Sequence, residues 1–343
     1  MIHAVSTRGS PSPPPEFRRV LEDLLADHFG RRRAIVKLSR RPCSYSSSFT
    51  LDEIDVGFDD GSELQLVMKD VSPAAMTKSA ERARPEFLFE PGREIEAYRR
   101  ILPHAPRGTA TWYGALVDQR ARRYRLVLER VEGLELRHVG AFSIWERAAQ
   151  WIAEFHQSFS PADVAQLAES SSVLVHDEAF YWRWLARAQK FAARRSSAGR
   201  TIDRIARGYA PVVSRLAGMP RTLIHGEFYP CNIRICQTRD EVRVCPVDWE
   251  MAALGPGLMD LASLTTGWGQ REQRALVRAY RRTNSDNATR SARIPHDLWL
   301  DFRCCRLHLA VRMLGWSDAW APPPHHAYDW LGEAERLAQR IGQ

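Results

Sequence analysis

Several features are missing from this 343-residue sequence. No apolar run approaches the roughly 20 residues that cross a bilayer, which excludes a transmembrane helix. Residues 1–16 contain no apolar core typical of a signal peptide, and we expect them to form a disordered lead-in. The six cysteines include no CxxC pair and no zinc-like spacing with histidine. Their pattern predicts reduced thiols in a cytoplasmic protein.

Lysine is also rare. Among 49 basic residues, the only lysines are Lys37, Lys69, Lys78 and Lys190. The net charge is +8, but the arginines are spread along the chain and interleaved with acids. Solvated helix faces explain this distribution better than a nucleic-acid groove, so we expect no nucleic-acid partner and no membrane partner.

Hydrophobic periodicity divides the chain into two parts. Runs with partial period-two alternation cover residues 33–38, 49–56, 63–70, 109–118 and 122–131. They predict an antiparallel sheet of about five strands. After Gly133 the period changes to that of amphipathic helices. The sequence therefore predicts an α+β fold of two lobes, with residues 17–131 as the N-terminal lobe and 132–343 as a mainly helical C-terminal lobe.

Lys69 lies near the end of the predicted strand 63–70, between apolar neighbours. If the aliphatic part of the Lys69 side chain is buried, its ammonium group needs a partner for its charge. Glu94, on the apolar side of a helix predicted to begin after Pro91-Gly92 and to end before Pro103, is the natural mate, and Glu96 is the rival. The alternative is a lysine on an edge strand that faces water.

Residues 222–250 hold the densest group of polar side chains. An apolar run leads to His225-Gly226-Glu227, a tight loop brings in Asn232, and two short strands end at Asp248. Two carboxylates and one carboxamide would thus meet at the mouth of a hairpin. Such an oxygen-rich site suits Mg²⁺ bound to phosphate oxygens.

These residues together resemble the aminoglycoside phosphotransferase and choline-kinase-like branch of the protein-kinase-like fold, over about residues 30–320. The resemblance implies a phosphotransferase that moves the γ-phosphate of ATP, or of GTP, to a hydroxyl of a small molecule. It implies Lys69 at the α- and β-phosphates, positioned by Glu94, and backbone groups of Glu129 and Val131 at the adenine. It also implies a phosphate loop of Ser46, Ser47 and Ser48, for which a plain polar hairpin loop is the alternative.

The resemblance further implies that Asn232 and Asp248 coordinate Mg²⁺ and that Glu227 is the catalytic base. His225 and Asp260 would tie the loop to the next helix, although for Asp260 a plain N-cap of that helix is a nearly equal alternative. His156, on the apolar face of its helix, is read as a satisfied core histidine.

One residue departs from the pattern that the resemblance implies, because Glu227 stands where aspartate is usual. A carboxylate misplaced by ~1 Å can cost ~10²-fold in rate, which is about 2.7 kcal/mol of barrier. A nucleotide-binding pseudokinase with lost or weak transfer is therefore the alternative function. Binding of nucleic acid, driven by the positive charge, is a third hypothesis.

The acceptor stays open between an antibiotic, in which case the activity would be antibiotic resistance, an amino alcohol, a sugar and another natural product. A polycation would need a local acidic patch, for which the candidates are Glu250, Asp297, Asp301 and Asp318. A quaternary amine or a flat acceptor would suit aromatic side chains, for which the candidates are Trp182, Trp184, Trp268, Trp316 and Trp320. The sequence does not indicate the oligomeric state.

Overall fold

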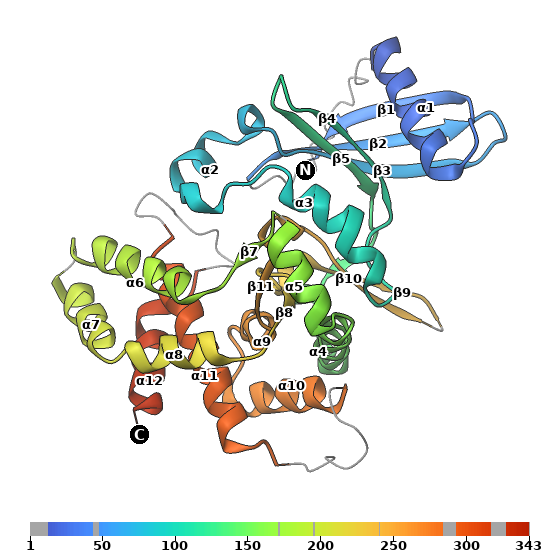
Figure 1. Cartoon of the computed structure of the whole chain (residues 1–343). Coiled ribbons are helices and arrows are strands. Elements are labelled where there is room, and N and C mark those ends of the chain that lie inside the picture. Colours follow the sequence, from blue (N-terminus) through green and yellow to red (C-terminus); the bar gives the residue numbers. More distant parts are fainter. Residues whose placement is uncertain are drawn as a thin grey trace, which may run out of the picture. The chain divides into compact units, whose positions relative to one another are not determined.

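The computed structural model describes residues 13–43, 48–170, 172–194, 196–239, 241–283, 293–316 and 327–342. They belong to two compact units (Figure 1). The first consists of residues 1–81 and 110–131, and the second of residues 82–109 and 132–343. Residues 82–109, which the sequence places in the N-terminal lobe, thus group with the helical unit.

The first unit contains the predicted sheet. Its strands are β1 (Ile35–Pro42), β2 (Thr50–Phe58), β3 (Glu63–Asp70), β4 (Trp112–Asp118) and β5 (Arg123–Glu129). All neighbours pair antiparallel, in the order β1-β2-β3-β5-β4. The prediction of five antiparallel strands is confirmed, and β3, which carries Lys69, is the central strand.

A helix that the sequence reading did not assign covers one face of this sheet. α1 (Pro15–Phe29) begins with a proline in its first turn and is followed by Gly30 at φ 65°, both ordinary helix-end signals. Its leucines share a core with the sheet, and the buried members include Leu21, Leu24, Leu25, Ile54, Leu66 and Met68. Of the expected lead-in, residues 1–12 lie outside the described part of the chain.

Short helical turns connect β3 to β4. They are η1 (Pro73–Ala75), α2 (Lys78–Ala83), η2 (Glu86–Leu88), α3 (Arg93–Glu96), η3 (Ala97–Ile101) and η4 (Leu102–His104). The single helix predicted before Pro103 is therefore one α-helical turn followed by a π-helical and a 3₁₀ turn. Such local changes of helix type are frequent at functional sites.

Helices dominate the second unit. They are α4 (Phe142–Gln157), α5 (Pro161–Ser170), α6 (Glu178–Ala192), α7 (Ser196–Arg207), α8 (Ala210–Gly218), α9 (Leu258–Leu264), α10 (Gln270–Thr283), α11 (His296–Leu314) and α12 (Trp330–Ile341). The change to a helical period after Gly133, which the sequence predicts, agrees with these helices. Within this unit α11 packs against α6, α8, α9 and α12.

Two small sheets of the second unit carry the polar loop. One has the order β10-β9-β6, and the other has the order β7-β11-β8. Their strands are β6 (Leu134–Glu135), β7 (Leu174–Val175), β8 (Arg221–Ile224), β9 (Ile233–Gln237), β10 (Val242–Pro246) and β11 (Ala253–Pro256). The hairpin β9–β10 is the strand pair that the sequence predicts.

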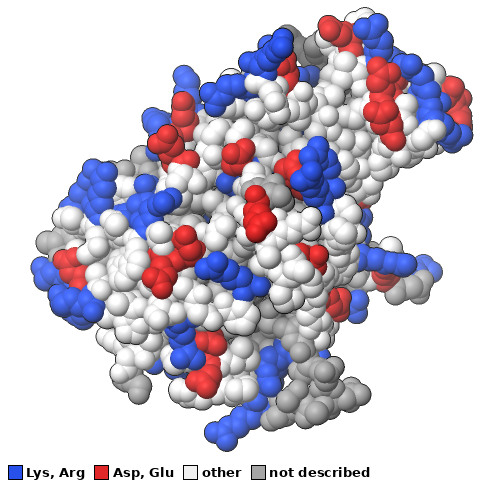
Figure 2. All heavy atoms as spheres, viewed as in Figure 1, with Lys and Arg blue, Asp and Glu red and all other residues white. Residues whose placement is uncertain are grey.

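The surface carries mixed charge. Figure 2 shows basic and acidic side chains interspersed on the visible face, as expected from the interleaved sequence. In the described part of the chain, no helix has both the length and the apolar character needed to span a membrane.

Candidate active site

The second residue of the loop that follows β8 is a glycine that no other residue could replace without strain. Gly226 adopts φ +81°, and a Cβ at this position would lie 2.1 Å from the carbonyl oxygen of Met251. Residues with a Cβ avoid this left-handed region, and the backbone leaves no space for one. The glycine therefore allows the chain to turn sharply just before Glu227.

Asp260 of α9 holds this turn in place. Its side chain is fully buried and accepts hydrogen bonds from the amides of His225 (2.7 Å) and Gly226 (2.9 Å). The structural role implied for Asp260 is confirmed, and the N-cap alternative is wrong because Gly257 caps α9. His156 lies 3.1 Å from the same carboxylate and 2.8 Å from the Tyr280 hydroxyl, so it is a satisfied core histidine, as predicted.

The imidazole of His225 links the loop to the end of the hairpin. Its Nδ1 accepts from the amide of Glu227 at 3.3 Å, so Nε2 carries the proton and donates to the carbonyl of Val247 at 3.0 Å. Burial lowers the pKa of His225, which favours this neutral form. The side chain thus fixes Glu227 relative to the residue that precedes Asp248.

Asn232 and Asp248 flank the β9–β10 hairpin, whose last pair joins Ile233 to Pro246. The Asn232 carboxamide donates to the carbonyl of Glu227 at 3.1 Å, and the backbone carbonyl of Asn232 accepts from the amide of Val247 at 2.9 Å. Asp248 has φ 68°, an uncommon conformation for a residue with a Cβ. Strained backbone of this kind persists where the surroundings hold it, often at functional sites.

Three acids meet beside this hairpin. Carboxylate oxygens of Glu94, Asp248 and Glu250 all lie within 4.8 Å of one another. Glu94 is 2% exposed and accepts from the amide of Trp249 at 3.3 Å. Its rival Glu96 forms surface ion pairs with Arg99 and Arg100. The structure therefore brings Glu94 to Asp248, which the sequence reading did not foresee.

Buried arginines surround the acids. Arg84 lies 2.6 Å from Glu250, with side chains only 7% and 10% exposed. Burial opposes the charge on Arg84, but the carboxylates of Glu250 and Glu227 outweigh it and raise the pKa of this guanidinium. Arg93 donates to the carbonyls of Leu88 and Glu250, and burial lowers its pKa to about 10.

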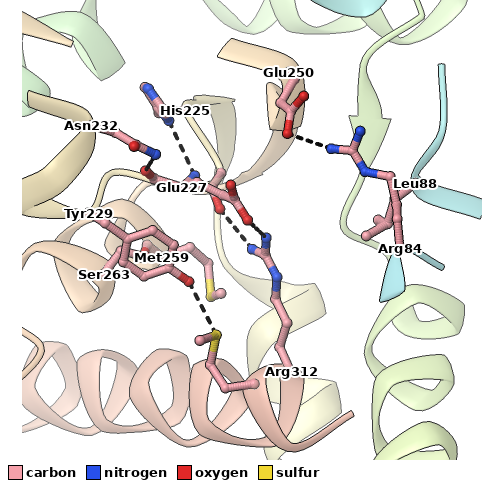
Figure 3. A network of polar contacts seen from close by, with 12 residues as sticks. Arg84, Leu88, His225, Glu227, Tyr229, Asn232, Glu250, Met259, Ser263 and Arg312 are labelled. Atoms are coloured by element: carbon pink, nitrogen blue, oxygen red, sulfur yellow. Dashed lines mark hydrogen bonds and ion pairs between the residues drawn. The ribbon is translucent and has the colours of Figure 1, made fainter. Parts of the chain in front are cut away.

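Glu227 itself is ion-paired. Arg312 of α11 donates one hydrogen bond to its Oε1 and another to the carbonyl of Gly226, both at 2.7 Å (Figure 3). Burial raises the pKa of Glu227 to about 7, although Arg312 acts in the opposite direction. The negative charges of Glu250 and Asp248 raise the pKa of Glu227 as well.

The remaining predicted site residues lie in the first unit. Lys69 is 7% exposed and pairs with Leu51 and Leu126 in the middle of the sheet, so the alternative of an edge-strand lysine is wrong. Its Nζ lies 5.9 Å from the ring centre of Phe49. Because Glu94 belongs to the other unit, their pairing stays a prediction.

The predicted nucleotide loop and connector are described in part. Ser46 and Ser47 lie outside the described residues, and the carbonyl of Ser48 accepts from the amide of Thr77. Glu129 donates its amide to Thr111 and accepts from the Thr111 hydroxyl. Val131 is the last residue of the first unit. Their roles toward a nucleotide stay predictions.

Sequence reasoning missed Arg84 and Arg312. Arg84 falls in a proline-containing segment with alternating charges, where nothing local marks it. Arg312 interrupts the apolar run LHLAVRMLGW, and a cation inside such a run is the signal that singled out Lys69. The same test, applied to arginine, would have found it.

Comparison with known proteins agrees with this architecture. A model of the phosphotransferase enzyme family (APH) matches residues 54–294. A GDP complex of a variant of aminoglycoside 2'-phosphotransferase-IIIa is 16% identical, covers 95% of this chain and 97% of its own, and has a TM-score of 0.56. No match was found among curated protein sequences.

Two further solved structures are similar. Plasmodium vivax ethanolamine kinase is 10% identical over 89% of this chain and 82% of its own, with a TM-score of 0.55. A spectinomycin phosphotransferase bound to ADP and spectinomycin is 10% identical over 94% and 98%, with a TM-score of 0.53. At these identities the likeness establishes the fold.

Proposed function

This chain belongs to the phosphotransferase enzyme family, and from this premise we propose that it transfers the γ-phosphate of a nucleoside triphosphate to a hydroxyl of a small molecule. The observation that carries the proposal is the arrangement of Glu227, Asn232 and Asp248 around one hairpin, with acids and buried arginines beside them. Phosphoryl transfer needs metal ligands, cations and one carboxylate at the attacking hydroxyl.

The oxygen donors fit Mg²⁺. Glu94, Asp248 and Glu250 offer carboxylate oxygens within 4.8 Å of one another, and Mg²⁺ takes oxygen ligands in proteins. We propose that Asp248 and Asn232 hold the ion. Bound there, Mg²⁺ would neutralise charge on the phosphates. Glu250 would be kept in place by its bond to Arg84.

The chain's cation for the phosphates would be Lys69. Its place in the central strand supports this role, because a side chain on a packed strand is held in a more defined position than one on a loop. Backbone groups of Glu129 and Val131 would bind the base, with Ser46, Ser47 and Ser48 near the phosphates. ATP is the expected donor and GTP the alternative; among the similar structures, one is a GDP complex and another an ADP complex.

Glu227 would accept the proton of the attacking hydroxyl. Its pKa of about 7 suits a general base near neutral pH, because the carboxylate is then ionised in a large fraction of molecules and still basic. The proton would pass to a carboxylate oxygen of Glu227 as the hydroxyl oxygen bonds to the γ-phosphorus, and the bond from that phosphorus to the bridging oxygen would break to release the nucleoside diphosphate.

The candidates for an acidic acceptor patch are paired with arginines. Glu250 binds Arg84, and Asp297 and Asp301 both accept from Arg215, while Asp318 lies outside the described residues. Of the tryptophans, Trp184 is fully buried and Trp268 packs on Phe142 and Trp145. Trp316 stacks on Trp184, and Trp320 also lies outside the described residues. The acceptor therefore stays open between antibiotic, amino alcohol, sugar and other natural product.

An ADP-release screen tests the proposal. Purified protein would be assayed with Mg·ATP and Mg·GTP against hydroxyl compounds of these four classes. We expect acceptor-dependent release of ADP from ATP, or of GDP from GTP, that Asp248→Asn abolishes. Unchanged release in that variant would refute the role of Asp248.

The second candidate is a pseudokinase, which the glutamate at 227 favours. Glu227→Asp separates the two functions. In an active enzyme built around Glu227, the shorter side chain should lower the rate of ADP release, whereas in a pseudokinase it should raise the rate strongly. In both cases the protein should still bind the nucleotide. This binding is measured as an increase of the thermal unfolding temperature in the presence of Mg·ATP.

A further inference from the structure

Arg312 contacts the proposed base and the backbone next to it. It lies in the last turns of α11, is 1% exposed, and donates from Nη1 to Gly226 and from Nη2 to Glu227 (Figure 3). One planar guanidinium therefore sets the direction of the Glu227 side chain relative to its own peptide. Such two-point contacts give geometric specificity as well as energy.

The guanidinium is itself held by aromatic packing. The rings of Trp184 and Trp316 are stacked, with centroids 5.7 Å apart and planes 9° from parallel. The Cζ of Arg312 lies 5.8 Å from the centre of the Trp184 ring and 5.7 Å from that of Trp316. Both distances fall within the range of cation–π attraction. Arg312 thus reaches Glu227 from a packed position and not from a flexible surface.

Glutamate needs such support more than a shorter acid would. Its side chain has three torsions, and displacement of a reacting carboxylate by ~1 Å can cost ~10²-fold in rate. Arg312 binds Oε1, so this ion pair does not use Oε2. One carboxylate oxygen would be fixed while the other receives the proton.

We propose that Arg312 is the positioning residue for Glu227, and that it acts on the rate of transfer through this carboxylate alone. The inference rests on the proposed function. A merely structural role for Arg312 is the rival, since it also binds the Gly226 carbonyl. However, Asp260 holds the amides of His225 and Gly226 independently, so the loop has a second anchor.

The chain offers a matched control on the same helix. Arg306 is also largely buried in α11 and bonds to Gln273 and Glu333, neither of which belongs to the proposed site. Arg306→Gln therefore removes an equivalent buried ion pair. It should alter stability but leave turnover within about twofold.

The test measures ADP release from Mg·ATP with water as the acceptor, in wild type, R312Q, R312K, R306Q, E227Q and E227Q/R312Q. We expect R312Q to lower kcat by ~10–100-fold, with KM for Mg·ATP changed less than about threefold. R312K should recover part of the loss. In the E227Q background, R312Q should have no further effect, because Arg312 acts through Glu227.

Several results would overturn the proposal. They are a kcat of R312Q near that of wild type, equal decreases of kcat in R312Q and R306Q, or additive effects of the two substitutions on the kcat of E227Q/R312Q. Thermal unfolding of each variant shows whether it is folded. If R312Q does not fold, the kcat of R312K tests the proposal in its place. A wild-type protein that binds Mg·ATP but releases no ADP with water or any acceptor would refute the proposed function, and the positioning role would fall with it. A failure confined to R312Q would refute the positioning role alone.

Discussion

The carboxylate of Asp260 binds the amide of Gly226 at 2.9 Å, across 34 residues of sequence. The same carboxylate binds the amide of His225, and all three residues are buried. The loop that carries Glu227 is therefore anchored from α9, independently of its own hairpin.

Removal of this anchor should destabilise the protein. Asp260→Ala leaves two buried amides without an acceptor, and each such group costs about 1–3 kcal/mol. We expect the free energy of unfolding to fall by about 3 kcal/mol, measured by urea denaturation. Asp329→Ala is the control, since Asp329 caps α12 through the amide of Gly332 and should cost about 1 kcal/mol. Equal losses in both variants would contradict the anchoring role.

Gly226 and Gly267 form a second matched pair. Both have positive φ, +81° and +86°, but a Cβ at Gly267 meets nothing within 4 Å. Gly267→Ala should cost about 1–2 kcal/mol from the left-handed backbone alone. Gly226→Ala adds the clash with the Met251 carbonyl, so we expect about 3 kcal/mol and loss of ADP release. Similar unfolding midpoints in the two variants would contradict this, because they would show that the loop rearranges to accommodate the Cβ without an added loss of stability.

The ionisation of Glu227 should appear in the pH dependence. A base must be ionised, and burial raises the pKa of Glu227 to about 7, so kcat/KM for Mg·ATP should increase with pH and level off above about 7. Below that value it should fall about tenfold per pH unit. Arg312 favours the ionised form of Glu227. R312Q should therefore raise the pKa of Glu227 and shift the rising part of the pH profile to higher pH. A flat profile from pH 5.5 to 8.5 would exclude Glu227 as the base.

The ion pairs of Glu227 and Glu250 affect which charge the acceptor can carry. Glu227 and Glu250 are each bonded to a buried arginine, so neither offers a net negative charge to a polycation. We expect ADP release with kanamycin to be no faster than with an uncharged sugar such as methyl glucoside. Arg84→Gln should increase the relative rate with kanamycin. Strong turnover of kanamycin by wild type, at many times the rate of uncharged sugars, would contradict this expectation.

Local patterns were enough for much of the fold and part of the site. Period-two alternation predicted the five strands, and the lysine in an apolar strand marked Lys69 as buried. The spacing of Asn232 and Asp248 around two short strands predicted their place at one hairpin. These inferences succeed because strand periodicity and hairpin pairing join residues that are close in sequence.

The ion pairs depended on tertiary structure. Arg312 and Glu227 are 85 residues apart, and Arg84 and Glu250 are 166 apart. Neither pair follows from local spacing, since each exists only because packing of helices and turns brings the partners together. The sequence alone predicted a set of residues for phosphoryl transfer, and their roles stay predictions. Only the tertiary structure decided that buried arginines hold two of the carboxylates, because burial and long-range contacts set both their geometry and their charge.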